Sequence, residues 1–565
     1  MAKVISIGNQ SFESIREKDN FYIDKTNFIR EWWDNDDTVT LITRPRRFGK
    51  TLNMSMLECF FSNKYKDRVD LFEGLEIWND EKYRKLQGTY PVIFLSFAEI
   101  KQNNYNDAVE KIKRIVCEVC QQFEFLKNWD GLTEIEKKNI SNISYNMSDV
   151  MAQDLIKNMS NYLSRYYGKK VIILLDEYDT PMQEAYVNGY WEELVAFTRS
   201  LFNSTFKTNP YLERAIMTGI TRVSKESIFS DLNNLKVITV TSDEYSKCFG
   251  FTEDEVFAAL DEQGLSSEKE KVKLWYDGFT FGDEKDVYNP WSIINFLDEK
   301  KYKTYWADSS SNGLVNELIR TGSAEIKKTM ETLIAGGTVE KNIDEQIVFE
   351  QLKTNKDAVW SLLLASGYLR VETFRTEGRL NKKIYSLKLT NYEVEQMFGT
   401  MIERWFGGAD VPYNEFINAM LNGDIESMNE YMNRVTRGVI SYFDTGKTPS
   451  DEEPERFYHG LVLGLMVEQV DNYILNSNRE SGYGRYDIML EPIDKTNEKY
   501  PGIVIEFKVI NPRKENTLEE TVAAALKQIE EKNYDAELVK RGVKEENIHH
   551  YGFAFRGKEV LIDGR

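Results

Sequence analysis

Histidine is scarce in this 565-residue sequence. The chain has three histidines: His459, His549 and His550. All of them lie near the C-terminus, and this excludes a metal site built mainly from histidine side chains.

Cysteine is almost as rare, with four residues in the chain. They are Cys59, Cys117, Cys120 and Cys248. Cys117 and Cys120 form a CxxC pair, but the surrounding sequence KIKRIVCEVCQQFEFL has the periodicity of an amphipathic helix, and no second pair lies nearby. We therefore expect a buried helical face at this pair and not a zinc site, and a reducing, cytoplasmic compartment.

The sequence also lacks an excess of basic residues and any long apolar run. Lys and Arg number 72 against 92 Asp and Glu, which gives a net charge of −20. An acidic chain of this kind is not a general nucleic-acid binder, and contact with nucleic acid requires a local basic surface. No apolar run approaches the length of a membrane helix, and the N-terminus has no signal-peptide core, so we expect no membrane association.

A strand, a loop and a helix follow one another between residues 38 and 61. TVTLIT indicates a strand, RPRRFGKT a turn, and LNMSMLECFF a helix, which is the context of a phosphate-binding loop. The glycine lets the backbone approach phosphate, the lysine reaches the terminal phosphates, and the threonine holds Mg²⁺. The predicted nucleotide-binding residues of the loop are Arg47, Phe48, Gly49, Lys50 and Thr51, with Thr51 also a metal ligand.

One position departs from the usual G-x-x-x-x-G-K-[ST] spacing. The first glycine falls at position 44, where the sequence has Arg44. We expect this residue to be tolerated, because the direct phosphate contacts come from the Gly-Lys-Thr end of the loop. Arg46 and Arg47 add positive charge for phosphate or for a partner.

A second motif, KKVIILLDEYDTP at residues 169–181, is an apolar strand that ends in two acidic residues. A continuous apolar run is typical of a central parallel strand covered on both faces. We predict that Asp176 binds Mg²⁺ and that Glu177 orients or deprotonates the attacking water. The alternative is a buried strand with a polar exit turn.

A third strand is predicted from ERAIMTGITRVS, residues 213–224. Thr218 stands at its C-terminal end, where a sensor of the γ-phosphate would lie. Arg222 follows, and two interpretations remain open for it: stabilisation of transferred charge, in cis or in trans, or an ordinary surface salt bridge.

Six segments of the first half resemble the AAA-ATPase-like family of bacterial proteins. They are NFYIDKTNFI, RPRRFGKTLNMSMLECFF, LFEGLEIW, YPVIFLSF, LLDEYDTP and GITRVSKESIFSDLNNL. The resemblance includes arginine at the first glycine of the loop, so Arg44 is expected to be a family trait. It implies ATP as cofactor, a relationship to archaeal and STAND-type P-loop ATPases, and a C-terminal domain of the PD-(D/E)XK nuclease class.

The middle of the chain is predicted to hold a helical lid and a winged-helix-like module. FGFTEDEVFAAL indicates a Thr-capped helix, and the STAND resemblance implies a lid whose Pro290 contacts the nucleotide base. A helix that simply begins at Pro290, with Asn289 as its cap, is the alternative. Residues 358–394 indicate a helix, a turn at Gly367 and two strands.

The tip of the predicted hairpin has a basic edge. Its residues are Arg375, Arg379, Lys382 and Lys383. Such modules can bind DNA, but we prefer a role in packing.

The C-terminal part has the order Asp, then Glu-x-Lys, of a metal-dependent nuclease. Asp487 is predicted in a short strand within SGYGRYDIMLEP, and Glu506 and Lys508 project from one face of the strand PGIVIEFKVI. Asp487 and Glu506 can share a divalent metal, and Lys508 can position or activate the attacking water. A salt-bridged strand without catalytic function is the alternative.

Further segments of this part resemble the PD-(D/E)XK-type domain that accompanies the ATPase family. SNRESGYGRYDIML and IEFKV carry the resemblance from about Pro454 to Lys558, with Tyr486 in place of the usual proline. The resemblance implies a helix motif formed by Gln528 and Tyr534 beside the active site. Glu455, in the helix that opens the fold, is a further expected metal ligand.

The sequence thus predicts an α/β chain in three parts. They are a P-loop ATPase domain with a central parallel sheet (1–250), a helical and winged-helix-like middle (251–450) and a restriction-endonuclease-like domain (451–565). We expect ATP and Mg²⁺ as cofactors, nucleic acid as partner with DNA preferred over RNA, and ATP-controlled phosphodiester cleavage. The alternative is an NTP-driven switch whose nuclease-like domain serves only as a platform for a partner.

Overall fold

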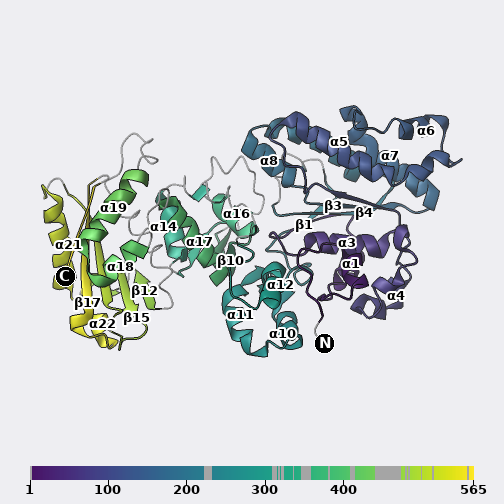
Figure 1. Ribbon diagram of the computed structural model, residues 1–565. Coiled ribbons are helices and arrows are strands. Elements are labelled where there is room, and N and C mark those ends of the chain that lie inside the picture. The colour runs from purple at the N-terminus through teal and green to yellow at the C-terminus, as the bar shows by residue number, and fades with distance from the viewer. Residues whose placement is uncertain are drawn as a thin grey trace. The chain divides into compact units, whose positions relative to one another are not determined.

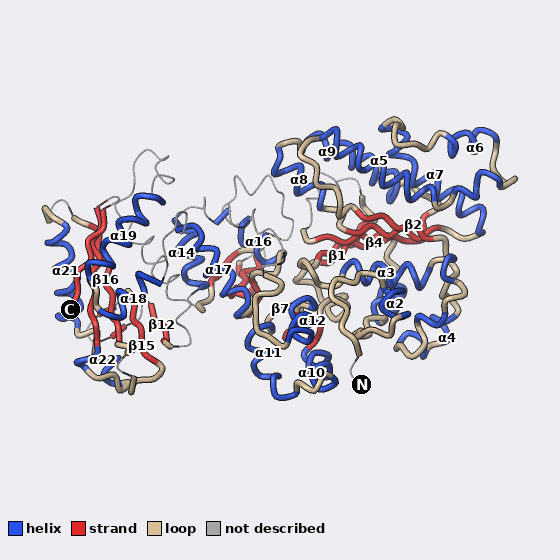
Figure 2. The backbone as a smooth tube through the Cα atoms, in the orientation of Figure 1, coloured by secondary structure: helices blue, strands red, loops and turns tan. Residues whose placement is uncertain are grey.

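The computed structural model describes most of the chain in two compact units (Figures 1 and 2). The first unit comprises residues 1–306 and 340–393, and the second comprises residues 307–339 and 394–565. The residues described are 3–221, 229, 232–307, 309, 315, 318–319, 324–334, 336–344, 358–378, 382–406, 414–439, 472–477, 480–481, 484–485, 487–497, 499–511, 515–556 and 559–565. None of the helices within these ranges has the length and apolarity to cross a bilayer.

A parallel five-stranded sheet forms the centre of the first unit. Its strands, in spatial order, are β2 (Val92–Ser96), β3 (Val171–Asp176), β4 (Leu212–Gly219), β1 (Val39–Thr43) and β5 (Leu235–Ile238). All neighbours run parallel. Every residue of β1 and β3 is buried, as their continuous apolar sequences predict for strands covered on both faces. The strands expected from TVTLIT, VIILLD and ERAIMTG are therefore confirmed.

Helices cover both faces of this sheet, with α5 and α7 on one side and α1 and α3 on the other (Figure 1). Their bounds are α1 (Phe12–Glu17), α2 (Asn27–Asn35), α3 (Lys50–Phe61), α4 (Glu81–Arg84), α5 (Tyr105–Gln121), α6 (Glu134–Ser141), α7 (Asp149–Tyr167), α8 (Thr180–Asn188) and α9 (Trp191–Phe202). Cys117 and Cys120 lie on the buried face of α5. The prediction of a buried helical face at the CxxC pair is confirmed.

The rest of the first unit contains two antiparallel sheets and the helices beside them. One sheet has the order β6 (Phe251–Thr252), β8 (Glu284–Tyr288), β7 (Phe279–Phe281), and the other β10 (Leu369–Glu377), β11 (Lys382–Leu389), β9 (Val339–Lys341). The helices are α10 (Glu253–Glu262), α11 (Lys269–Tyr276), α12 (Pro290–Glu299) and α16 (Ala358–Ala365). Thr252 caps α10 in a capping box with Glu255, as expected.

The helix, turn and hairpin expected between residues 358 and 394 are confirmed as α16, a turn at Gly367, β10 and β11. Gly367 has φ +87°, and a Cβ atom there would lie 2.9 Å from both Pro45 and Phe279. The turn therefore needs glycine for its conformation and for its close approach to the loop after β1. The winged-helix assignment and the three-part division of the chain stay predictions.

The second unit contains a mixed sheet between two layers of helices. The strand order is β12 (Tyr473–Ser477), β15 (Ile488–Pro492), β16 (Gly502–Val509), β17 (Ile548–Arg556), β18 (Glu559–Gly564). Only β16 and β17 run parallel among the described pairs of this sheet. The ribbon β13 (Glu480–Ser481) and β14 (Gly484–Arg485) stands apart from it. The helices are α14 (Ala324–Ile334), α17 (Tyr392–Phe406), α18 (Asn414–Asn422), α19 (Ile425–Val439), α21 (Leu518–Lys532) and α22 (Ala536–Lys540). The first two residues of α17 belong to the first unit.

Strand β16 is buried on both faces. Ile503, Ile505 and Phe507 pack with methionines of α18 and α19, and Val504 packs with Ile529 of α21. Glu506 and Lys508 alternate with the first set, so they lie on the α21 face. The α/β class predicted from the sequence is confirmed for both units.

Candidate functional site

The loop predicted to bind phosphate connects β1 to α3, as the strand–loop–helix pattern requires. Gly49 is the N-cap of α3 with φ +78°, a left-handed conformation that favours glycine. A Cβ atom at Gly49 would meet nothing within 4 Å, so backbone conformation and not space selects glycine here. The helix N-terminus with its free N–H groups follows at once, which suits an anion.

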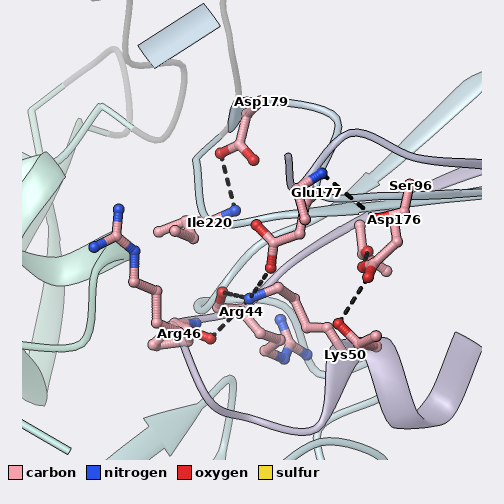
Figure 3. A network of polar contacts seen from close by, with 12 residues as sticks. Arg44, Arg46, Lys50, Ser96, Asp176, Glu177, Asp179 and Ile220 are labelled. Atoms are coloured by element: carbon pink, nitrogen blue, oxygen red, sulfur yellow. Dashed lines mark hydrogen bonds and ion pairs between the residues drawn. The ribbon is translucent and has the colours of Figure 1, made fainter. Parts of the chain in front are cut away.

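Lys50 is buried and its ammonium is held inside the loop (Figure 3). Nζ donates to the carbonyl oxygens of Arg44 at 3.2 Å and Pro45 at 3.0 Å. An ion pair joins it to Glu177, with 3.6 Å between Nζ and Oε1. A phosphate oxygen that enters the loop would compete with these acceptors for the ammonium. Binding of phosphate is therefore linked to the geometry of the loop backbone, because Lys50 would leave the two carbonyls.

Asp176 receives hydroxyl groups from two other elements. Thr51 Oγ1, in the first turn of α3, donates to Oδ2 at 2.7 Å, and Thr218 Oγ1, near the end of β4, donates to Oδ1. Burial raises the pKa of Asp176, helped by the charge of Glu177, whereas the two hydroxyls and Lys50 oppose this rise. The oxygen donors of Thr51 and Asp176 fit a hard cation such as Mg²⁺, whose charge would offset the cost of the buried carboxylate.

Glu177 follows β3 in an uncommon backbone conformation. Its φ of +53° lies in the left-handed region, which non-glycine residues seldom adopt. This turn directs the carboxylate to Lys50. The strain is located at the residue for which the sequence predicts the water-orienting role, a common position for stored strain.

Asp179 was missed by the sequence analysis. It is fully buried, and its Oδ2 accepts from the backbone N–H groups of Ile220 at 3.0 Å and Thr221 at 2.9 Å (Figure 3). Burial raises the pKa of this carboxyl. Asp179 thereby connects the turn after β3 to the turn after β4, the strand that carries Thr218 near its end. The fourth letter of DEYD was the available signal, an acidic residue just beyond the recognised pair.

Arg44 is completely buried and bonded to backbone of its own chain. Nη1 donates to the carbonyls of Thr43 at 3.0 Å and Thr239 at 2.7 Å, and Nη2 to those of Glu244 at 3.3 Å and Tyr245 at 3.4 Å. The guanidinium also lies 4.5 Å from the Phe281 ring centroid. Burial lowers its pKa to about 10, so it stays charged at neutral pH. Arg44 therefore joins the loop to the segment after β5.

The remaining predicted nucleotide-binding residues surround the loop. Arg47 is exposed and lies over the Trp291 ring at 4.3 Å, while Phe48 packs edge-on against Phe279 and Phe281. Pro290 is the first residue of α12, with Asn289 as N-cap. The helix-start interpretation of Pro290 is thus confirmed, and its contact with a base stays a prediction. Arg222 lies outside the described residues.

The second set of predicted residues lies on β16 and beside it. The sequence predicted Asp487 within a short strand, and this is wrong: Asp487 is the residue immediately before β15. The physical reason is that the side chain of Asp487 takes the place of a backbone carbonyl in bonding to β16: Oδ2 accepts from the Phe507 N–H at 2.8 Å. Burial raises the pKa of Asp487, and Lys508 and the Phe507 N–H oppose this. Its carboxylate thus lies at the residue next to Glu506.

Gln528 of α21 connects the two charged residues of β16. Lys508 Nζ donates to its Oε1 at 2.7 Å, and its Nε2 donates to Glu506 Oε1 and to the Tyr534 hydroxyl, the latter at 3.1 Å. Lys508 and Glu506 are also ion-paired at 3.9 Å. Glu506 and Tyr534 are nearly inaccessible, whereas 27% of the Lys508 side chain is exposed. The network holds Lys508 at the edge of a buried carboxylate.

The carboxylates of Asp487 and Glu506 have the oxygen donors that Mg²⁺ prefers. In the described ranges no group of three or more His, Cys, Asp or Glu side chains is arranged to hold a metal ion. Glu455, the third predicted ligand, and Tyr486 lie outside those ranges. A cation at this place would take its remaining ligands from water, from substrate or from that part of the chain.

The predicted basic edge of the β10–β11 hairpin is partly neutralised. Arg375 forms an ion pair with Glu340, and Lys383 lies 5.4 Å from the Phe374 ring centroid. Arg379 falls outside the described residues. A DNA contact at this hairpin stays a prediction.

Comparison with known proteins identifies both ends of the chain. A family model described as "Predicted AAA-ATPase" matches residues 6–229, and a model of the PD-(D/E)XK nuclease superfamily matches residues 453–564. A curated relative, "Uncharacterized protein in vnfD 5'region" of Azotobacter chroococcum mcd 1, is 25% identical over 396 residues, which are 70% of this chain and 68% of the relative. The chain therefore carries an AAA-ATPase-like domain at residues 6–229 and a domain of the PD-(D/E)XK nuclease superfamily at residues 453–564.

Proposed function

We propose that this protein binds and hydrolyses ATP and uses it to control Mg²⁺-dependent cleavage of nucleic-acid phosphodiester bonds. The observation that carries the nuclease part is the Lys508–Gln528–Glu506 network on a buried strand. A buried carboxylate and an ammonium are costly to desolvate, and a salt bridge alone seldom repays that cost. A catalytic role would explain why this polar network is kept next to Asp487.

In the ATPase domain, five residues at the loop would take part in phosphoryl transfer. Lys50 would exchange the carbonyls of Arg44 and Pro45 for phosphate oxygens, and Thr51 and Asp176 would hold Mg²⁺. Glu177, released from its ion pair with Lys50, would orient the attacking water. Thr218 would report the γ-phosphate to Asp176, which it already contacts.

In the nuclease domain, Asp487 and Glu506 would hold the cation. A divalent cation at these carboxylates would neutralise charge on the phosphodiester and favour ionisation of water. Gln528 keeps Glu506 and Lys508 in fixed orientation because one amide group bonds to both. Lys508 would place a proton donor or acceptor at the attacking water, and the Tyr534 hydroxyl helps to fix Gln528 by accepting a hydrogen bond from its amide.

The substrate we propose is DNA in preference to RNA, bound through local basic groups on a chain of net charge −20. We propose action in the cytoplasm, in keeping with four cysteines that are all free and buried. A metal-dependent nuclease assay tests the function, with single-stranded DNA, double-stranded DNA and RNA, each with ATP, with ADP and without nucleotide.

Glu506→Gln provides the decisive variant, because it keeps the shape of the side chain and removes a ligand. Glu491→Gln is the matched control, since Glu491 is equally buried in the same domain but is paired with Lys495 and Arg541. We expect Glu506→Gln to lose cleavage and keep ATP turnover, and Glu491→Gln to keep both. Equal cleavage by Glu506→Gln and wild type would contradict the proposed site. A wild type that hydrolyses ATP and cleaves nothing would favour the platform function.

For the ATPase part, Lys50→Ala should abolish turnover, because it removes the only side-chain ammonium held in the loop. Lys64→Ala, at an exposed position just after α3, is a control of the same chemistry. ATP hydrolysis by purified Lys50→Ala at the wild-type rate would refute the ATPase function.

A further inference from the structure

Three consecutive carbonyl oxygens of the phosphate loop are engaged by side chains. Lys50 takes those of Arg44 and Pro45. The third, on Arg46, accepts from Asn289 Nδ2 at 3.2 Å and from the indole Nε1 of Trp306 at 3.0 Å. These two donors come from the start of α12 and from the segment after it. The loop backbone is therefore held at three adjacent peptides, by Lys50 at two of them and by Asn289 and Trp306 at the third.

One carboxylate holds both elements that reach Arg46. Glu393, the second residue of α17, accepts the Trp306 backbone N–H at Oε1, 2.6 Å, and the Ser292 hydroxyl at Oε2, 2.8 Å. Ser292 lies in the first turn of α12, which Asn289 caps. Glu393 is completely buried, so a broken bond here would leave a charge without compensation, and the arrangement is expected to be rigid.

Aromatic side chains enclose this route. The Trp306 ring packs edge-on against Phe279 at 5.3 Å and lies 5.4 Å from Tyr368, and Phe48 of the loop packs on Phe279 at 4.8 Å. Trp306 is 3% exposed. Water is largely excluded from the hydrogen bonds, which strengthens them and limits alternative partners.

We propose that Trp306 and Glu393 are positioning residues for the phosphate loop and that they carry the nucleotide state of the loop to α17. The inference rests on the proposed binding of ATP. When phosphate draws Lys50 away from two loop carbonyls, the neighbouring Arg46 peptide shifts, and its carbonyl pulls on Trp306 and on α12. Both are fixed to Glu393, so the start of α17 shifts with them. By linkage, loosening this route must also change the affinity for nucleotide.

Hydrogen exchange of backbone amides in α17, with and without a non-hydrolysable ATP analogue, tests the inference on the full-length protein. In wild type we expect nucleotide to change exchange in the first turns of α17. Trp306→Phe keeps a ring against Phe279 and Tyr368 but removes the N–H that reaches Arg46. This variant should bind the analogue about three- to tenfold more weakly, the loss of one buried hydrogen bond, and it should reduce the exchange response of α17, because Asn289 is then the remaining donor to Arg46.

Three further variants make the result specific. Asn289→Asp keeps an acceptor that caps α12 but removes the donor to Arg46, and it should reproduce Trp306→Phe if that variant does not fold. Glu393→Gln keeps an oxygen acceptor for the Trp306 N–H but replaces the acceptor of the Ser292 hydroxyl with an amide donor, so it should reduce the response of α17. Trp275→Phe is the control, because the rings described against Trp275 are those of Tyr276, Tyr302 and Tyr392, the last beside Glu393.

The outcomes separate the two proposals. A nucleotide response of α17 that is equal in wild type, Trp306→Phe and Asn289→Asp would overturn the route and leave ATP binding intact. The same holds for a wild type that binds the analogue with no change in α17. Failure of wild type to bind the analogue would overturn the proposed ATPase function, and the route with it.

Discussion

Replacing Arg44 with glycine would restore the usual first glycine of the phosphate loop, yet we expect Arg44→Gly to harm the protein. The guanidinium is buried, with short hydrogen bonds of 3.0 and 2.7 Å to Thr43 and Thr239. Bonds of this kind from a charged donor contribute roughly 2 kcal/mol each. The longer bonds to Glu244 and Tyr245 and the ring of Phe281 add roughly 2 kcal/mol together.

Two further effects enter with opposite sign. Removing the buried charge raises the free energy of unfolding by roughly 3 kcal/mol, because burial lowers the pKa of Arg44 from 12.5 to about 10. The flexible backbone of glycine costs roughly 1 kcal/mol. The free energy of unfolding of the first unit should therefore fall by about 4 kcal/mol, and ATP turnover should decrease because the loop loses its tie to the segment after β5.

Urea unfolding followed by tryptophan fluorescence suits this measurement, since all but Trp405 of the 10 tryptophans lie in the first unit. Arg47→Gly is the matched control on the same loop. Arg47 is exposed and has φ +65°, so glycine relieves strain there and stability should change by about 1 kcal/mol or less. An Arg44→Gly protein as stable as wild type, or with faster ATP turnover, would refute the argument.

Other predictions concern Asp277 at the end of α11, the network around Gln528 and the acidic turn after β3. Burial and the neighbouring Asp286 raise the pKa of Asp277 from 3.8 to about 7, so its contribution to stability is present below pH 4 and is lost as pH rises through 7. Asp277→Asn should match wild type in urea at pH 4 and exceed it by about 2 kcal/mol at pH 8; equal stability at both pH values would contradict this. Gln528→Leu should lower the rate of cleavage at saturating Mg²⁺ by about tenfold or more, because Lys508 and Glu506 lose their common partner, and an unchanged rate would show that the amide has no positioning role. Glu177→Gln should retain ATP analogue binding and slow hydrolysis, measured as phosphate release, and wild-type hydrolysis would exclude Glu177 as the residue that orients water.

Local patterns in the sequence were enough to predict the elements that bear the candidate sites. β1, β3 and β16 are short apolar runs with polar residues at or near their ends, and α3 and α21 follow with helical periodicity. The motifs consist of residues close together in the chain, so the strand and the turn after it determine the backbone position of each motif residue. The pairing of Glu506 with Lys508 on one face needed only the two-residue period of a strand.

Tertiary structure decided which distant groups meet these residues. Three of the four carbonyls that accept from Arg44, those of Thr239, Glu244 and Tyr245, lie about 200 positions further along the chain. The donors to the Arg46 carbonyl are 243 and 260 positions away. Such contacts impose no periodicity on the sequence, because a backbone carbonyl is the same acceptor whatever its residue type. Arg44 could therefore be recognised as an anomaly from the sequence, but only the packing of β5 and the segment after it against the loop makes an arginine at that position a buried structural link.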